Sequence, residues 1–196
     1  MSETATISPR RSAGIGPGRL VLVVGPSGAG KDTLIGLAKA ACGNDRTIVF
    51  SRRVVTREGS ASEDNEHLSA ASFEEALARD DFAVHWRAHG QLYGLRRGID
   101  DEIRGGRTVV ANVSRTVVEA MRCAYADVMV VSVTAPPEAR AERLASRARG
   151  SDGEIALRLE RVVDETAVAP DVTILNVGNA EEHAQRLIQI IRGDCT

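Results

Sequence analysis

A glycine-rich turn between two hydrophobic segments constrains this chain most. Residues 25–31 read Gly-Pro-Ser-Gly-Ala-Gly-Lys and fit the spacing G-x-x-x-x-G-K. The apolar, β-branched segment 19–24 before them is typical of a strand buried on both faces. Residues 32–42 after them carry Leu34 and Leu37 at helical spacing. Such a turn binds phosphates, because its glycines let backbone N–H groups converge and the helix N-terminus attracts anions. We therefore predict a site for the phosphates of a nucleoside triphosphate, and we expect ATP.

The predicted nucleotide site comprises this turn and the first residues of the helix. Lys31 is expected to bridge the β- and γ-phosphates during transfer, which makes it a catalytic candidate. Asp32 stands where the usual consensus has Ser or Thr on Mg²⁺. Two interpretations of Asp32 stay open. It contacts Mg²⁺ through a water molecule, with Thr33 as the other candidate ligand, or it is an acidic first-turn residue favoured by the helix dipole. The predicted nucleotide-binding residues are Gly25, Pro26, Ser27, Gly28, Ala29, Gly30, Lys31, Asp32 and Thr33.

Apolar and helical segments alternate along the rest of the chain. This alternation predicts an α/β fold of the P-loop NTPase class, in three layers, with a parallel sheet flanked by helices. Further buried strands are expected at 47–50, 108–113, 128–133 and 172–176. Helices are expected at 72–79, 99–105, 115–124, 137–148, 154–168 and 180–192.

We expect one kinase domain over residues 19–196, preceded by a disordered, polar tail at 1–18. Within the domain, segment 51–106 is polar and rich in arginine, and we interpret it as an inserted acceptor-binding region. The charged, glycine-containing segment 145–161 is interpreted as a mobile lid. The remaining segments form the predicted core: 19–50, 107–144 and 162–196.

The composition argues against several functional classes. A net charge of −2 over 196 residues is not that of a general nucleic-acid binder. No apolar segment approaches the roughly 18 residues that a membrane-spanning helix needs. Cys42, Cys123 and Cys195 lack metal-ligand spacing and predict reduced thiols in a cytoplasmic protein. The expected partner is therefore a small molecule, with no nucleic acid and no membrane.

From residue 20 onward the chain resembles the guanylate kinases. Thr56-Arg57 resembles their phosphate-binding turn T-T-R, and residues 82–94 resemble the segment that ends in Tyr-Tyr-Gly. This resemblance implies a nucleoside monophosphate kinase-like fold, an acceptor-phosphate contact at Tyr93 and an adenine contact at Asn176. Pro136-Pro-Glu and the arginines after it resemble the start of the family's lid. The arginines that would close over the transferring group are Arg143, Arg147 and Arg158, with Arg149 as a further candidate.

The chain departs from the guanylate kinases where those enzymes read guanine. His85 stands before Trp86 where the family has Glu, and Asn112 and Ser114 stand where it has Asp. Discrimination between bases depends on pairing buried polar groups, so these changes predict that guanine selection is largely lost. Trp86 is interpreted as packing or as a ligand contact, and His85 as a sugar contact or a partly exposed polar residue.

The changed pattern is similar to that of the ribose 1,5-bisphosphate phosphokinases of phosphonate degradation. That family pairs G-P-S-G-x-G-K-D-[ST] with R-x-x-T-R, W-x-A-x-G-x-x-Y-G and V-N-x-S-R, found here at 25–33, 53–57, 86–94 and 111–115. The resemblance implies transfer of the γ-phosphoryl group of ATP to ribose 1,5-bisphosphate, giving 5-phosphoribosyl 1-diphosphate. Two phosphates and no base suit additional arginines. The implied acceptor-binding residues are Arg53, Thr56, Arg57, Tyr93, Asn112, Ser114 and Arg115.

This resemblance also implies a mechanism without a general base. An oxygen of the 1-phosphate is already ionised at neutral pH, so catalysis reduces to alignment and charge stabilisation. Two alternatives remain: an ordinary guanylate kinase, and a non-catalytic guanylate-kinase-like binding module. The residues at 85, 112 and 114 argue against the first. The retained Lys31 and lid arginines argue against the second, since a scaffold has no reason to keep them.

Overall fold

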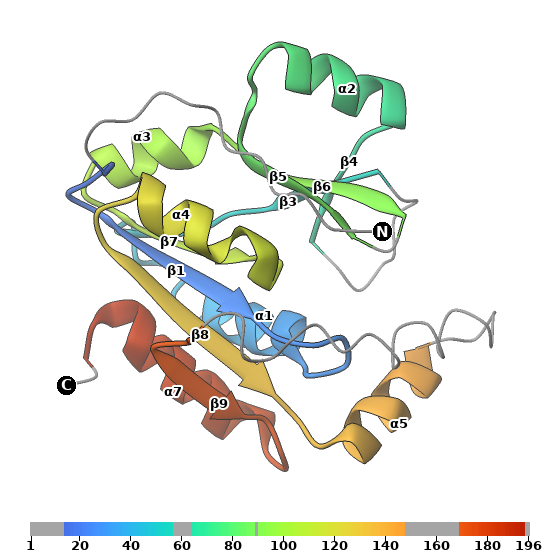
Figure 1. The fold of residues 1–196 in the computed structure, drawn as a ribbon. Coiled ribbons are helices and arrows are strands. Elements are labelled where there is room, and N and C mark those ends of the chain that lie inside the picture. Colours follow the sequence, from blue (N-terminus) through green and yellow to red (C-terminus); the bar gives the residue numbers. More distant parts are fainter. Residues whose placement is uncertain (1–13, 57–63, 89, 148–168, 195–196) are drawn as a thin grey trace. The chain divides into compact units, whose positions relative to one another are not determined.

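The computed structural model describes residues 14–56, 64–88, 90–147 and 169–194 (Figure 1). Its strands are β1 (Arg19–Val24), β2 (Ile48–Phe50), β3 (Arg53–Val55), β4 (Glu66–His67), β5 (Phe82–Ala88), β6 (Gln91–Arg96), β7 (Thr108–Asn112), β8 (Val128–Thr134) and β9 (Val172–Leu175). Its helices are α1 (Lys31–Ala41), α2 (Ala70–Ala78), α3 (Gly98–Arg104), the 3₁₀ turn η1 (Arg115–Val117), α4 (Val118–Ala124), α5 (Pro137–Arg147) and α7 (Ala180–Arg192).

The strands of the main sheet follow the order β2-β7-β1-β8-β9. β2 pairs in parallel with β7, from Ile48 opposite Thr108 to Phe50 opposite Val110. β8 pairs in parallel with β9 in the same way. Helical segments separate these strands along the chain, as parallel pairing requires. The predicted α/β fold with a parallel sheet flanked by helices is confirmed.

By its internal contacts the chain divides into two compact units. The first unit comprises residues 1–22 and 45–129, which include the predicted acceptor-binding region. The second comprises 23–44 and 130–196, which include the phosphate-binding turn.

The first unit contains a second sheet that the sequence analysis did not predict. Its strand order is β4-β3-β6-β5, and β5 and β6 form an antiparallel hairpin. Helix α2 lies over this sheet (Figure 1), and its Phe73 and Ala76 pack with Val54 and Phe82 of the strands. The hydroxyl of Ser69 begins α2 by accepting from the backbone N–H of Ser72 at 3.0 Å. The region expected to be a polar insertion therefore has a small hydrophobic core of its own.

In the first unit, residues 14–18 are structured, which differs from the expectation for them. The tail was predicted to be disordered through residue 18, but the backbone of Ile15 bonds on both sides. Its N–H donates to Ala124 at 2.9 Å, and its carbonyl accepts from Ala126 at 2.9 Å. The side chain of Ile15 is buried, so this single apolar residue fastens residues 14–18 to the end of α4.

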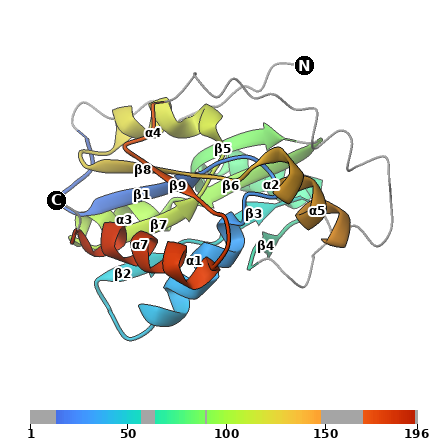
Figure 2. The same cartoon turned by 90° about the horizontal axis from the view of Figure 1, so that it is seen from below.

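In the second unit, α1 and α7 lie side by side (Figure 2). α7 buries an apolar stripe, and Asn179 caps its first turn by accepting from the N–H of Glu181 at 3.0 Å. The helix predicted at 154–168 lies outside the described residues, as does most of the predicted lid. Within the described part of the chain, no helix has both the length and the apolar character to cross a membrane.

Candidate active site

The predicted phosphate-binding turn lies in the second unit, between the end of β1 and α1. Gly25, Gly28 and Gly30 have φ angles of +140°, +79° and +90°. Residues other than glycine rarely adopt these backbone conformations. A Cβ at Gly25 would also collide with the carbonyl oxygen of Val133. The spacing of glycines in the motif thus matches three backbone positions where only glycine fits.

Lys31 lies against this turn. Its Nζ donates to the carbonyl oxygen of Gly25 at 2.8 Å and to that of Pro26 at 3.0 Å. Both contacts place the ammonium group beside the backbone that is expected to bind phosphates. An ammonium in this position supplies the point charge that phosphate oxygens require.

Besides Lys31, three side chains from later in the sequence bind carbonyl groups of the turn. Nε of Arg140 donates to Ser27 at 3.1 Å. Nη1 of Arg143 lies 3.4 Å from the carbonyl oxygens of both Gly28 and Ala29. The side-chain amide of Asn176 donates to Ala29 at 2.7 Å. Side chains from α5 and from the end of β9 therefore bind the carbonyl groups of three successive residues of the turn, Ser27, Gly28 and Ala29.

Asn176 has partners other than the adenine contact expected for it. The residue is 3% exposed, and its side-chain nitrogen donates to the carbonyl oxygen of Ala29. Its backbone N–H donates to Thr134 at 2.8 Å, and its carbonyl accepts from Arg143 at 3.1 Å. The residue is thus a buried link between β9 and the phosphate-binding turn.

Asp32 and Thr33, the candidate metal ligands, lie in the first turn of α1. Asp32 is partly buried and Thr33 is exposed. In the portion of the chain that the structure describes, no three His, Cys, Asp or Glu side chains gather into a metal site.

The lid arginines are only partly covered by the structure. Arg143 lies on α5 beside the turn, as described above. Arg147 is the last residue of α5, and its side chain is not among the described parts. Arg149 and Arg158 lie outside the described residues.

The predicted acceptor residues lie in the first unit. On the β5–β6 hairpin, Tyr93 is paired directly with Trp86, and their rings stack with centroids 5.6 Å apart. The next row on the same face carries Arg53 of β3 and the buried Val84 and Leu95. One face of this sheet therefore carries an arginine and a tyrosine hydroxyl beside buried apolar side chains.

Thr56 follows β3 and bonds to the start of β6. Its hydroxyl donates to Oε1 of Gln91 at 3.0 Å and accepts from the N–H of Leu92 at 2.9 Å. Thr56 thus joins the end of β3 to the start of β6. Arg57, which follows it in the predicted phosphate-binding turn, lies outside the described residues.

Arg53 contacts a residue that the sequence analysis did not single out. Its Nε lies 3.4 Å from Oδ1 of Asn65, which is buried. The neighbouring Arg52 donates to the carbonyl of Asn65 at 2.9 Å and pairs with Asp64 at 2.8 Å. The two arginines therefore hold the start of β4, and Asn65 helps to orient Arg53.

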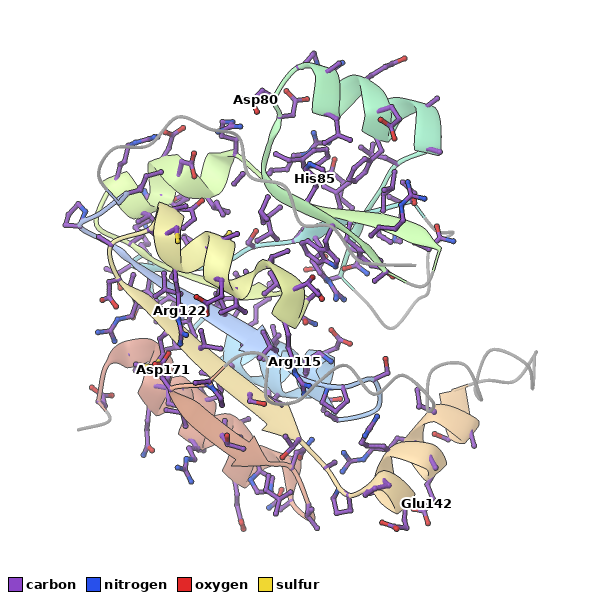
Figure 3. All side chains as sticks on the ribbon, viewed as in Figure 1. Asp80, His85, Arg115, Arg122, Glu142 and Asp171 are labelled. Atoms are coloured by element: carbon purple, nitrogen blue, oxygen red, sulfur yellow. The ribbon has the colours of Figure 1, made fainter. Side chains whose placement is uncertain are left out.

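The three residues expected after β7 lie together at its carboxyl end. Asn112 is buried at the last strand position, and Ser114 begins η1. The hydroxyl of Ser114 caps η1 by accepting from the backbone N–H of Thr116 at 3.4 Å, and it also accepts from the hydroxyl of Thr116 at 3.0 Å. Arg115 is the first residue of η1, which packs against β5 (Figure 3).

His85 does not lie on the face of Trp86 and Tyr93. It pairs with Gly94, one position along each strand, so its side chain points to the opposite face. There it lies between the hairpin and α2 (Figure 3). Burial lowers the pKa of His85, and the nearby Glu74 of α2 raises it by a smaller amount. His85 is half-buried on this face, and the residue before it, Val84, lies on the face of Trp86 and Tyr93.

Sequence reasoning missed Arg140 and Asn65. Arg140 was one of many arginines near the start of the predicted lid, and Asn65 followed a polar segment without a motif. The position of Arg140 three residues before Arg143 was an available indication, because such residues share one side of a helix.

A family model described as an AAA domain matches residues 21–165. The ribose 1,5-bisphosphate phosphokinase PhnN of Bradyrhizobium diazoefficiens is 58% identical over 194 residues, which cover 99% of this chain and 98% of that protein. The PhnN of Rhodopseudomonas palustris is 61% identical, covering 91% and 90%, and that of Methylobacterium radiotolerans is 51% identical, covering 90% and 98%. The chain belongs to the PhnN family and to the AAA domain family. As a PhnN family member it is a kinase, and its phosphate-binding turn implies the use of ATP.

The fold has a solved relative among the guanylate kinases. The crystal structure of guanylate kinase from Anaplasma phagocytophilum matches with a TM-score of 0.63 and 21% identity, covering 92% of this chain and 87% of that one. At this identity the match shows the fold alone. This chain thus has a guanylate kinase-like fold, as the sequence resemblance implied.

Proposed function

We propose that this chain transfers the γ-phosphoryl group of ATP to ribose 1,5-bisphosphate, giving 5-phosphoribosyl 1-diphosphate and ADP. The observation that carries this proposal is the 58% identity, over nearly the whole of both chains, to a protein named ribose 1,5-bisphosphate phosphokinase. We further propose that the reaction belongs to phosphonate breakdown in the cytoplasm. The free thiols of Cys42 and Cys123 fit that compartment.

The donor half of the reaction is supported by the turn at residues 25–30. Its glycines adopt the backbone angles of an anion-binding turn, and it leads directly into α1. Lys31 lies beside it and supplies positive charge for the donor phosphates. We propose that Asp32 and Thr33 hold Mg²⁺ at the first turn of α1. The metal ion, when bound, would neutralise charge on the β- and γ-phosphates.

The acceptor half is supported by the character of one sheet face. Arg53 and the hydroxyl of Tyr93 are suited to a phosphate group. Val84 and Leu95 beside them are buried and aliphatic, so they provide no polar partner for the edge of a base. We propose that Arg53, Thr56, Arg57 and Tyr93 bind one phosphate, and that Asn112, Ser114 and Arg115 bind the sugar or the other phosphate.

In the proposed reaction an oxygen of the 1-phosphate attacks the γ-phosphorus of ATP. The bond from the γ-phosphorus to the β–γ bridging oxygen breaks, and ADP leaves with that oxygen. The attacking oxygen is ionised at neutral pH, so no side chain has to remove a proton. The work of the protein is to align the two phosphates and to stabilise the charge that moves, and we assign the latter to Lys31, Arg143, Arg147 and Arg158.

An ADP-release assay with three alternative acceptors tests this proposal. With ATP and Mg²⁺ present, ribose 1,5-bisphosphate should support turnover. Ribose 5-phosphate lacks the attacking 1-phosphate, and GMP adds a base, so both should give at most a small fraction of that rate. ADP release with GMP alone would overturn the proposal in favour of a guanylate kinase.

The same assay tests the acceptor assignment of Arg53. Removing one bidentate phosphate contact with Arg53→Ala should raise KM for ribose 1,5-bisphosphate by about tenfold or more, because a hydrogen bond to a charged group contributes about 1.5–3 kcal/mol. KM for ATP should change far less. If KM rises for ATP alone, Arg53 does not bind the acceptor.

A further inference from the structure

The carbonyl groups of the phosphate-binding turn are held by side chains from distant parts of the second unit. In a trans peptide the C=O of one residue and the N–H of the next point in opposite directions. A side chain that fixes a carbonyl therefore also fixes the direction of the following N–H. In this turn the N–H groups are the expected phosphate ligands.

Arg140 and Asn176 make the two shorter of these contacts. Arg140 binds the carbonyl of Ser27 at 3.1 Å, so the N–H of Gly28 is turned away from α5. Asn176 binds the carbonyl of Ala29 at 2.7 Å, so the N–H of Gly30 is turned away from the end of β9. These two N–H groups belong to the positive-φ glycines of the motif.

The close fit of the two glycines supports the same arrangement. A Cβ at Gly28 would lie 2.8 Å from the carbonyl oxygen of Arg140. A Cβ at Gly30 would collide with the side-chain nitrogen of Asn176. The two residues thus contact the turn on its carbonyl side, closely enough to exclude any side chain there.

We propose that Arg140 and Asn176 are positioning residues for the donor phosphates. They hold the turn with its carbonyls outward, so that the N–H groups of Gly28 and Gly30 are directed at the bound triphosphate. Asn176 thereby acts on the phosphates of the nucleotide and not on its base. The inference rests on the donor half of the proposed function and is independent of the acceptor.

Equilibrium binding without acceptor tests this role. ATP and inorganic tripolyphosphate, each with Mg²⁺, would be titrated into the wild type, Asn176→Ala and Arg140→Ala. Loss of a fixed carbonyl contact should weaken both ligands by about tenfold and by the same factor. A contact with adenine would instead weaken ATP and leave tripolyphosphate binding unchanged.

Two matched substitutions serve as controls. Asn179→Ala removes the cap of α7, and Arg186→Ala removes an exposed arginine of the same helix. Both should keep wild-type affinity for both ligands. Thermal unfolding without ligand shows whether each variant is folded, and Arg140→Ala keeps the test decisive if Asn176→Ala does not fold.

Parallel losses for ATP and tripolyphosphate in a folded variant support the proposal. A loss for ATP alone in Asn176→Ala, or wild-type affinity in the folded variants, overturns it. Because no acceptor is present, failure of this test is distinct from failure to turn over ribose 1,5-bisphosphate.

Discussion

Gly94, the glycine after Tyr93, illustrates how a motif residue can be required by packing. A Cβ at this position would lie 2.6 Å from Cδ1 and 2.8 Å from Cε1 of Phe82, whose ring stacks on Phe73 of α2. Gly94→Ala should therefore displace a buried ring and lower the free energy of unfolding by about 1–3 kcal/mol, as overpacking does. Urea denaturation measures this change.

Gly98 is the matched control for this substitution. It begins α3, and a Cβ there would meet no atom within 4 Å. Gly98→Ala should leave the stability unchanged or raise it slightly, because alanine favours the helix and restricts the unfolded chain. Equal losses in both variants would contradict the packing role of Gly94.

His85 predicts a pH dependence of stability. Burial holds its pKa in the folded protein below the ordinary value of 6.5. The unfolded chain therefore takes up the proton first as the pH falls, and stability is lost from about pH 6.5 downward. His85→Asn should remove this part of the loss, so urea denaturation at pH 7.5 and pH 5.5 should differ less in the variant than in the wild type.

His67 on the neighbouring β4 provides the comparison, since its side chain is exposed. The His67→Asn variant should lose stability with acid as the wild type does. If the His85 variant also declined like the wild type, burial of His85 between the hairpin and α2 would not couple to protonation.

Among the helices, α3 is held at its first turn by hydrogen bonds and an ion pair of Arg97 and Asp100. Arg97 donates to the carbonyls of Asp80 at 2.7 Å and Phe82 at 2.9 Å, and it lies 3.7 Å from a carboxylate oxygen of Asp100. Asp100 is 2% exposed and accepts from the hydroxyl of Tyr125 at 2.6 Å. This set joins α3 to the start of β5 and to the end of α4.

Arg97→Ala should lower the free energy of unfolding by about 1.5–3 kcal/mol, because it removes the charge-assisted hydrogen bonds to Asp80 and Phe82 and the cation beside a buried carboxylate. Arg104→Ala in the same helix removes a surface pair with Asp101, whose side chain is 83% exposed. That pair should contribute about 0.5 kcal/mol or less. Chemical denaturation of both variants tests the contrast, and equal losses would contradict it.

The elements differ in how far their sequence predicted them. β1, the phosphate-binding turn and α1 are continuous in sequence, and the motif predicted all three. The second sheet was missed because β3 and β4 have only three and two residues, and β5 carries His85 and Arg87 among its apolar residues. Short strands of mixed polarity give no clear periodic pattern.

At the scale of the whole molecule, the family could be predicted but some contacts could not. The motifs of the PhnN family lie in short segments, and the relatives match this chain along almost its entire length. In contrast, Arg140 meets Ser27 across 113 positions, and Asn176 meets Ala29 across 147. Such contacts depend on how the second unit folds, so no local pattern indicated them. The face of His85 depended in the same way on the pairing register of the hairpin.

The destination of the transferred phosphoryl group can be followed by phosphorus-31 NMR of the reaction mixture. With ATP, Mg²⁺ and ribose 1,5-bisphosphate, we predict that the signal of the 1-phosphate disappears as two coupled diphosphate signals and ADP appear, while the 5-phosphate signal persists. A control with GMP should give at most a small fraction as much GDP at matched enzyme concentration. Formation of GDP with GMP but of no sugar diphosphate with ribose 1,5-bisphosphate, or consumption of ATP without a sugar diphosphate, would contradict this assignment.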